Sequence, residues 1–416
     1  MAKNLCGAAV VGQSGGPTAA INATLGGVIS CALENENITK LYGMQNGIEG
    51  LIDGKMIDLG AIFAPGGKAD SGKVDLLCQT PASALGSCRK KLPDPETDRT
   101  VFDKLLGVFM ENGIRYFFYI GGNDSMDTVS KLSRYLETVD YEMRVVGLPK
   151  TIDNDLMGTD HTPGYGSAAK YIATVVSEIV RDCAVYEVPA VTIVEIMGRD
   201  AGWLTAAAGL PAVCGGSAPD YVYLPERAFS LDAFFSDIEA ALSRHPGVVV
   251  AVSEGICYAD GTSVGESAQS GATDVFGHKY LAGVGKALEM EVKNRLGCKV
   301  RSVELSLPQR CASHIASATD ISESFGVGYA GVGAAIGGAS GCMMTIVRAD
   351  GDYAVTYETS GIAGIANMTK SVPLSYINEA GNNVTRECLE YIKPLIQGEA
   401  AVRYKDGLPM QLVLGR

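Results

Sequence analysis

The sequence predicts an α/β protein built on parallel, doubly wound sheets, and two observations predict it. Short apolar runs alternate with amphipathic helical stretches along most of the 416-residue chain. Most of these runs end in glycine and polar residues, as expected at the carboxyl ends of parallel strands, where open α/β sheets bind ligands. The length favours two or three compact units, and a 47% hydrophobic composition is ample for a substantial interior.

The first expected strand, residues 5–11, leads through Gly12-Gln13-Ser14-Gly15-Gly16-Pro17 into a helix over 18–33. Pro17 suits the first helical turn, where its missing N–H costs nothing. Exposed backbone N–H groups and the helix dipole would favour a phosphate at this point. The spacing matches neither a Walker A loop nor GxGxxG. A tight βα turn without any ligand therefore explains the motif about equally well.

A loop with clustered cations follows. Residues 38–60 predict a second strand and a short helix, and 64–90 predict a surface loop over the strand ends. The loop closes with Cys88-Arg89-Lys90-Lys91. Three cations in a row usually mark a solvated face, but in a chain with a formal net charge of −13 they would also suit a phosphate.

The next strand ending is unusually rich in acid and amide. A helix over 97–112 precedes a strand over 115–120, which ends in Gly121-Gly122-Asn123-Asp124-Ser125. The simplest explanation is that one of the last three residues caps the helix that runs on to residue 136. One cap needs only one such residue, so the excess would suit Mg²⁺, which takes oxygen ligands.

Three further strand endings carry chemistry. The strand over 144–148 ends in Lys150-Thr151-Ile152-Asp153-Asn154-Asp155, which is either an Asx-rich turn or a reactive loop. Strands over 190–196 and 248–252 end in Met197-Gly198-Arg199-Asp200 and Ser253-Glu254-Gly255. An arginine at a strand end suits bidentate phosphate recognition, although a salt bridge within the loop is nearly as good an explanation. The remaining expected elements are helices over 167–182, 231–244, 280–295 and 322–336, one near 201, and strands over 221–224, 300–307, 341–348 and 353–358.

Composition excludes several classes. The acidic balance disfavours a nucleic-acid or anionic-membrane partner but leaves room for a small anion in a local basic pocket. The 11 cysteines show no CxxC pair and no metal-finger spacing. Reduced, buried thiols in a cytosolic protein are therefore expected, Cys31, Cys183 and Cys214 among them. We expect neither a secretory signal nor a bilayer-spanning run.

Four motifs in this order, Gly-Gly-Asn-Asp-Ser, Pro-Lys-Thr-Ile-Asp-Asn-Asp, Met-Gly-Arg and Gln-Arg, make the sequence resemble the 6-phosphofructokinases, within them the pyrophosphate-dependent branch. The resemblance runs from Gly12 to Arg310 and is weaker through 365–368. It implies two similar Rossmann-like domains with the active site in the cleft between them. Residues 1–166 plus 309–360 would bind pyrophosphate and Mg²⁺, and residues 167–308 plus 361–416 would bind the sugar phosphate.

The resemblance implies a Mg²⁺-dependent, reversible phosphoryl transfer. Pyrophosphate and fructose 6-phosphate would give fructose 1,6-bisphosphate and phosphate, in cytoplasmic glycolysis or gluconeogenesis. The enzyme would be a homodimer or a larger assembly, without nucleic-acid or membrane partners. Alternatives are an ATP-dependent phosphofructokinase, a sedoheptulose 7-phosphate kinase of the same fold, or a non-catalytic regulatory subunit.

The resemblance also implies roles for individual residues. Asp153 would be the base that takes the proton from the sugar 1-hydroxyl, and Arg199 would stabilise the transferring phosphoryl group. Arg301 would act across a subunit interface, and Asn123 would hold the metal. The implied catalytic set is Asp153, Thr151, Arg199, Lys150 and Asp124; the donor-phosphate set is Gly12, Asp124, Lys150 and Arg89; the sugar-phosphate set is Thr151, Ile152, Asp153, Met197, Gly198, Arg199, Glu254, Arg301, Leu307 and Arg310.

Donor choice rests mainly on Asp124. ATP-using relatives carry a glycine at that position, which leaves room for the α-phosphate of a nucleotide. Lys150 is weaker evidence, because some ATP-using relatives share it. The sequence departs from the family pattern at Asn123, where the metal aspartate is usual, and at Ala190, where many relatives have a second cross-subunit arginine. A histidine common in the sugar pocket is replaced near Leu307-Pro308.

Overall fold

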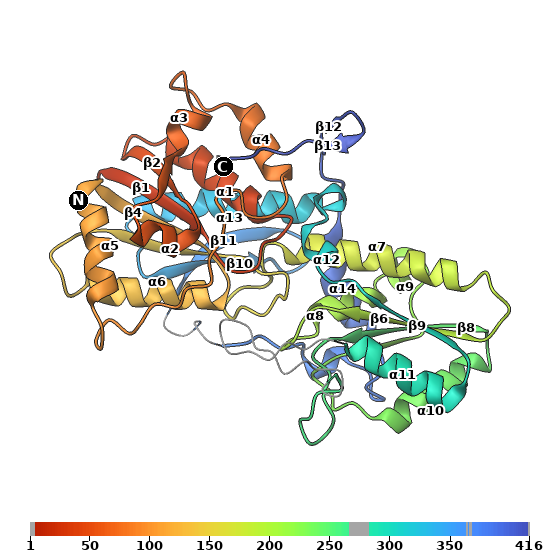
Figure 1. The fold of residues 1–416 in the computed structure, drawn as a ribbon. Helices are drawn as coiled ribbons and strands as arrows, with labels where there is room; N and C mark the ends of the chain where they lie inside the picture. The colour runs from red at the N-terminus through yellow and green to blue at the C-terminus, as the bar shows by residue number, and fades with distance from the viewer. Residues whose placement is uncertain (1–4, 266–282, 363–364, 366–367, 415–416) are drawn as a thin grey trace.

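The computed structural model describes residues 5–265, 283–362, 365 and 368–414, and their strands form two main sheets (Figure 1). The larger sheet has seven strands in the order β11-β10-β5-β4-β1-β2-β3. Its central strands run parallel, and only the edge strands β3 and β11 pair antiparallel. The strands are β1 (Gly7–Gln13), β2 (Ile38–Met44), β3 (Met56–Asp58), β4 (Ile114–Gly121), β5 (Arg144–Pro149), β10 (Cys342–Arg348) and β11 (Val355–Gly361).

The smaller sheet has four strands in the order β7-β8-β6-β9, and every pair is parallel. Figure 1 shows the two sheets in separate lobes, with α12 and the start of α7 at their junction. The four strands are β6 (Ala190–Ile196), β7 (Tyr221–Tyr223), β8 (Gly247–Ser253) and β9 (Lys299–Glu304). A two-stranded hairpin, β12 (Tyr404–Lys405) with β13 (Leu408–Pro409), lies near the C-terminus.

The helices follow the strands in the order expected of doubly wound sheets. Several connections are longer than one helix, and short 3₁₀ turns occur at 207–209, 313–315, 374–376 and 393–396. The helices are α1 (Ile21–Leu33), α2 (Gly47–Ile52), α3 (Leu59–Phe63), α4 (Ser71–Gln79), α5 (Thr100–Glu111), α6 (Asn123–Leu136), α7 (Tyr165–Cys183), α8 (Trp203–Ala206), α9 (Pro211–Cys214), α10 (Leu231–Leu242), α11 (Val284–Leu296), α12 (Pro308–Cys311), α13 (Ala318–Ile336) and α14 (Arg386–Ile392).

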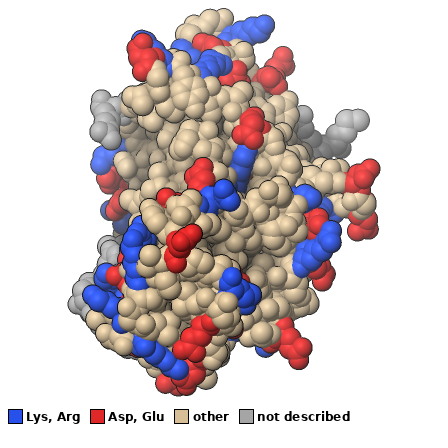
Figure 2. Space-filling model, turned by 90° about the vertical axis from the view of Figure 1, so that its right-hand side faces the viewer, with Lys and Arg blue, Asp and Glu red and all other residues tan. Residues whose placement is uncertain are grey.

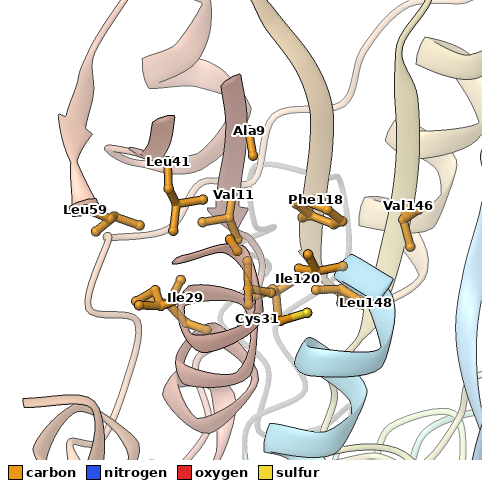
Figure 3. Packing of buried hydrophobic residues seen from close by; sticks show 14 of the residues in the cluster. Ala9, Val11, Ile29, Cys31, Leu41, Leu59, Phe118, Ile120, Val146 and Leu148 are labelled. Carbon is orange, nitrogen blue, oxygen red and sulfur yellow. The ribbon is translucent and has the colours of Figure 1, made fainter. Parts of the chain in front are cut away.

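Both faces of the larger sheet are covered, which explains why its strands are apolar runs without alternation. Val11 and Phe118 point to the face under α1 and α13, where Figure 3 shows them packed with Ile29. Val10 and Phe117 point to the opposite face, under α5 and α6. Each such side chain contributes about 1.5–3 kcal/mol through burial. The smaller sheet is covered in the same way, with α7 on one face and α10 and α11 on the other. The predicted α/β class with two doubly wound units is confirmed.

Three local expectations were wrong. Helix α1 begins at Ile21, so Pro17 lies outside it, in the irregular segment that precedes it. The expected surface loop over 64–90 contains helix α4, whose N-cap Asp70 accepts a hydrogen bond from the Lys73 N–H and whose apolar residues pack toward α1. The helix expected near residue 201 is reduced to the single turn of α8. The start of the helix expected over 280–295 lies outside the described residues, and α11 is described from Val284.

The cysteines are all free thiols. Cys31 is buried, as expected, but Cys183 is only partly buried and Cys214 is exposed, because it ends the single-turn helix α9 at the surface. Among the described residues, every helix is too short or too polar to traverse a lipid bilayer. On the face in Figure 2, positive and negative side chains are interspersed, which is typical of a solvated surface.

Candidate active site

The carboxyl ends of β1, β4 and β5 in the larger sheet and of β6 and β8 in the smaller sheet meet at one cleft of about 510 Å³. This is where open parallel sheets place their ligand sites. Side chains from both sheets and from the loop over 88–91 line it. Of the sequence-predicted site residues, the cleft brings together Arg89, Asn123, Asp124, Lys150, Thr151, Ile152, Asp153, Met197, Arg199, Glu254 and Arg310.

The loop after β5 owes its shape to Asn154. This residue is fully buried and adopts a left-handed backbone conformation with φ of 53°, which asparagine tolerates better than most residues. Its Oδ1 accepts a hydrogen bond from the Thr162 N–H at 3.0 Å, and the Thr162 hydroxyl donates to the Thr151 carbonyl at 2.9 Å. The turn is thus fixed from behind, and Asp153 and Asp155 on either side of Asn154 both line the cleft.

Asp153 is a partly buried carboxyl whose side chain is bonded by Thr151. The Thr151 hydroxyl donates to Asp153 Oδ2 at 3.3 Å and accepts from the Asp153 N–H at 3.1 Å. Burial raises the pKa of Asp153, while the Thr151 hydrogen bond and the positive charge of Lys150 lower it. Burial also raises the pKa of Asp155 to about 7, with the neighbouring Asp153 charge adding to the effect. Such displaced carboxyl pKa values are typical of functional sites.

Lys150 is the deepest cation in the cleft. Its side chain is 2% exposed, and Nζ donates to the Gly16 carbonyl at 2.6 Å. Burial lowers its pKa to about 8, Asp153 opposes this, and the nearby Arg310 charge lowers the pKa further. The pKa of Arg310 is itself lowered by burial and by repulsion from Arg89. Lys150, Arg310 and Arg89 repel one another in the cleft, so an anion bound among them would be favoured.

The opposite wall is built by the loops after β6 and β8. Gly198 has a φ of 122° and donates its N–H to Glu254 Oε1 at 3.2 Å, while Ser253 Oγ donates to the Gly198 carbonyl at 2.7 Å. A Cβ on Gly255 would collide with the Arg199 carbonyl, so a glycine is needed there for the two loops to meet. Arg199 Nε is buried without a hydrogen-bond partner. Arg199 Nε therefore does not form the salt bridge within the loop that was the alternative explanation for this residue.

Glu254 is an unusual carboxyl in this wall. Burial raises its pKa to about 7, the hydrogen bond from Gly198 opposes this, and the negative charge of Asp153 raises the pKa further. Arg199 lowers the pKa of both Glu254 and Asp153. Glu254, Asp153 and Arg199 are therefore close enough to alter one another's pKa values, which places them in one site.

The polar side chains at the start of α6 do not cap the helix. The N-cap position is Gly122, which has no side chain to cap with. Asn123 Oδ1 is buried without a hydrogen-bond partner, and Asp124 Oδ1 pairs with Lys91 Nζ at 3.1 Å. The capping explanation for Asn123 and Asp124 was therefore wrong, and both side chains face the cleft.

Four predicted site residues do not line the cleft. Gly12 is buried in β1, where an added Cβ would meet Met44 at 2.5 Å, so its α-carbon faces the core. Gly198 acts through its backbone, as described above. Arg301 lies exposed on the edge strand β9, and Leu307 is 53% exposed just before α12.

Several cleft residues were missed. Gly15 and Gly16 line the cleft, and a Cβ on either would lie 3.4 Å from Lys150 Nζ or Arg310 Nη1, respectively. They belong to the same glycine loop as Gly12, and their place two and three residues beyond the end of β1 was the available signal. Lys91, which belongs to the cation run that the sequence suggested for a phosphate, and Asp200, which follows Arg199, also line the cleft.

The described residues contain no group of three His, Cys, Asp or Glu side chains able to hold a metal ion. The donor set at the start of α6 still fits Mg²⁺, because Asn123 Oδ1 is an unpartnered oxygen and Asp124 is a carboxylate beside it. Mg²⁺ commonly takes only one or two protein oxygens and fills its shell with waters and substrate phosphates.

Comparison with known proteins agrees with this geometry. A curated protein of Halomonas elongata named pyrophosphate–fructose 6-phosphate 1-phosphotransferase is 41% identical over 401 residues, which cover 95% of this chain and 93% of that protein. A protein of Methylococcus capsulatus with the same name is 40% identical, covering 97% and 94%. The crystal structure of a pyrophosphate-dependent phosphofructokinase from Nitrosospira multiformis superposes with a TM-score of 0.87 at 35% identity, covering 98% of this chain and 96% of that one. The phosphofructokinase family model matches residues 8–332, and the chain therefore belongs to the phosphofructokinase family.

Proposed function

We propose that the chain is a phosphotransferase that moves a phosphoryl group reversibly between pyrophosphate and the 1-hydroxyl of fructose 6-phosphate. The observation that carries this is the pairing, in one cleft, of the partly buried carboxyl of Asp153 with the cations Lys150, Arg199 and Arg310. Phosphoryl transfer needs a base for the acceptor hydroxyl and positive charge around the transferring group. Two relatives that match nearly the whole chain carry the name of this reaction.

The donor would lie against the larger sheet. Lys150 and Arg89 bind its phosphates, and the backbone of Gly15 and Gly16 allows it to approach closely. A bound diphosphate would also favour the charged form of Lys150, because an adjacent anion offsets the burial that lowers its pKa. Gly12 supports this wall from the core rather than touching the donor.

The acceptor would lie against the smaller sheet. Glu254 and the backbone of Met197 and Gly198 suit sugar hydroxyls, whereas Arg310 suits the 6-phosphate. Asp153 takes the proton from the 1-hydroxyl as that oxygen attacks the donor, and Thr151 orients the carboxylate through its 3.3 Å hydrogen bond. Arg199 stabilises the negative charge on the phosphoryl group in transit. Ile152 packs beneath this loop, with 7% of its surface exposed.

Members of this family generally need a divalent metal, and we propose Mg²⁺ held by Asn123 and Asp124. The unpartnered Asn123 Oδ1 supports this choice. When bound, the ion would neutralise phosphate charge. The residues of this chain then need only hold the two substrates in line and move one proton.

We propose pyrophosphate rather than ATP as donor because of Asp124. This side chain sits in the first turn of α6 and is paired with Lys91 at 3.1 Å. A carboxylate there adds bulk and negative charge where a nucleotide would need room for its α-phosphate. Pyrophosphate is shorter than ATP and would not extend as far as Asp124.

We further propose that residues 1–166 plus 309–360 form the donor unit and 167–308 plus 361–416 the sugar unit, in a cytoplasmic enzyme. Strands β10 and β11 extend the larger sheet and support the first assignment. Self-association into a homodimer or larger assembly would explain Arg301 and Leu307, which are exposed and outside the cleft of their own chain.

The test is a donor and acceptor panel with the purified chain and Mg²⁺. Turnover of fructose 6-phosphate with pyrophosphate, and little with ATP, is expected. A clear preference for ATP would overturn the donor assignment, and a preference for sedoheptulose 7-phosphate would overturn the acceptor. A chain inactive with every pair would point to the regulatory-subunit alternative.

A further inference from the structure

The cations at 89–91 sit on a long segment that must be held by something other than its own secondary structure. Residues 80–99, between α4 and α5, form no helix or strand. Loops of this length without secondary structure are uncommon in compact domains and usually serve a function. Residues 88–91 of this segment line the cleft. Their position therefore depends on how the rest of the segment is anchored.

The anchor is a pair of fully buried amide side chains. Gln13 is the last residue of β1, and Asn22 lies in the first turn of α1. Both have 0% exposure, and Gln13 Nε2 donates to Asn22 Oδ1 at 2.9 Å. Neither side chain reaches the cleft.

The same two amides also hold the segment's backbone. Gln13 Oε1 accepts from the Leu85 N–H at 2.9 Å, and Asn22 Oδ1 accepts from the Ala84 N–H at 3.0 Å. Asn22 Nδ2 donates to the Thr80 carbonyl at 2.8 Å. Because a backbone N–H can only donate, both amides must point their oxygens toward the segment, and one orientation is selected.

The same pair also encloses the glycine loop. Gly15 and Gly16 lie between Gln13 and Asn22 in the sequence, so both ends of their loop are held. Two further bonds join this loop to the cation segment: the Gly15 N–H donates to the Cys88 carbonyl at 3.1 Å, and Ser87 Oγ donates to the Gly15 carbonyl at 2.7 Å. The glycine loop and the cation segment are thus fixed to each other from the core outward.

We propose that Gln13 and Asn22 are positioning residues for the donor site, which set the spacing between the Gly15–Gly16 backbone and Arg89. They touch no substrate and act through the segment that they anchor. The inference rests on the proposed function, because it assigns this spacing to pyrophosphate. A loosened pair would let the two sides of the donor site drift apart, while the sugar wall on the other sheet would keep its geometry.

The experiment compares Gln13→Met with Gln79→Met. Gln79 is a similarly buried glutamine, 8% exposed, whose side chain bonds Arg403 and Met410 away from the cleft. Losing buried hydrogen bonds at Gln13 is expected to raise the KM for pyrophosphate about five- to fiftyfold. The KM for fructose 6-phosphate should stay within about twofold, since its wall is unchanged. Gln79→Met should lower the melting temperature similarly and leave both KM values near those of the unmodified enzyme.

Ser87→Ala provides a second variant that leaves the core intact. It removes only the hydroxyl that bonds the Gly15 carbonyl, and it should raise the KM for pyrophosphate about two- to tenfold. If Gln13→Met does not fold, the KM values of Ser87→Ala test whether the link between the segment and the glycine loop controls pyrophosphate binding. The positioning role would be overturned if the KM values for pyrophosphate and fructose 6-phosphate changed equally. It would also be overturned if neither KM changed in an enzyme that uses pyrophosphate. An unmodified chain that does not use pyrophosphate would instead overturn the proposed function.

Discussion

The two walls of the cleft differ in the charges that they present. The wall from the larger sheet carries Arg89, Lys90, Lys91 and Lys150 beside a glycine loop. The wall from the smaller sheet carries Arg199 among carboxyls, with Glu254 at its centre. Both walls also carry carboxyls, Asp124, Asp153 and Asp155 on the first and Asp200 and Glu254 on the second, so the difference lies in the number of cations. The four cations of the first wall suit a diphosphate, whereas Glu254 and the backbone groups of the second suit sugar hydroxyls.

The difference shows how one fold type can serve two substrates. Both sheets offer the carboxyl ends of parallel strands, so the architecture does not distinguish donor from acceptor. The residues after each strand do, and the reacting groups sit where the walls meet: Asp153 comes from the larger sheet, and its pKa responds to Arg199 of the smaller one. Substitutions that affect one wall, or only the junction, should therefore have separable kinetic effects.

The largest effect is expected at the junction. Asp153→Asn keeps the shape of the side chain and removes the base, so kcat should fall by about 10²–10⁴-fold. Steady-state assays with saturating pyrophosphate and fructose 6-phosphate measure this. Asp127→Asn is the matched control, because Asp127 lies one turn into α6 and pairs with Lys131 outside the cleft. Near-normal turnover in Asp153→Asn would remove the base from the mechanism.

The next largest effect is expected from Arg199→Lys. Lysine keeps the positive charge but lacks the planar fork that binds two phosphoryl oxygens. A loss of about 10²–10³-fold in kcat is expected, with a smaller change in either KM. Arg134→Lys serves as control, since Arg134 pairs with Asp94 at the surface. A change confined to the KM for the sugar would place Arg199 in ground-state binding alone.

A smaller effect tests donor choice at the cationic wall. Asp124→Gly should raise the ratio of kcat/KM with ATP to kcat/KM with pyrophosphate about tenfold, because it removes bulk and charge near the first turn of α6, whereas the loss of an oxygen proposed for Mg²⁺ affects both donors. Lys91→Met breaks the same ion pair without making room. If both variants gain ATP use equally, the ion pair itself obstructs the nucleotide; if only Asp124→Gly gains, the bulk and negative charge of Asp124 decide the donor. Unchanged ATP use in both would contradict the role of Asp124.

The fold was predictable because the core and the connections obey local rules. Apolar runs such as the one around Val146 are typical of strands buried on both faces, and the order of strand and helix indicated parallel sheets. Helix α4 was missed because its few apolar residues, such as Val74 and Leu77, are diluted by glycine, serine and lysine. Its stability comes from packing toward α1, which no local pattern reports.

The sequence predicted those site residues that directly follow an expected strand. Most residues placed there by resemblance do line the cleft, but Gly12 does not, since one strand position decides whether a residue faces core or ligand. Gln13 and Asn22 were also beyond sequence reasoning. Their function depends on contacts with Leu85 and Ala84, more than sixty residues away in the chain.

The smallest expected effect separates stability from activity at the sugar wall. Burial raises the pKa of Glu254 to about 7, so ionising it costs more in the folded state than in the unfolded chain. Its contribution to stability is complete below the unfolded pKa and is lost as the pH rises through about 7. Glu254→Gln mimics the protonated form. It should match the unmodified protein at pH 4 and exceed its free energy of unfolding by up to about 3 kcal/mol at pH 9.

The same variant should bind fructose 6-phosphate more weakly, which gives the two measurements opposite signs. Denaturant titrations at both pH values measure stability, and the KM for the sugar measures binding. Glu96→Gln, at an exposed surface position, should change the free energy of unfolding by less than about 0.5 kcal/mol at either pH. A residue that weakens the fold above neutral pH yet improves sugar binding is retained for function. If Glu254→Gln lost stability and left the KM unchanged, Glu254 would instead be a structural partner of Gly198, and the acceptor wall would need another group to hold the sugar.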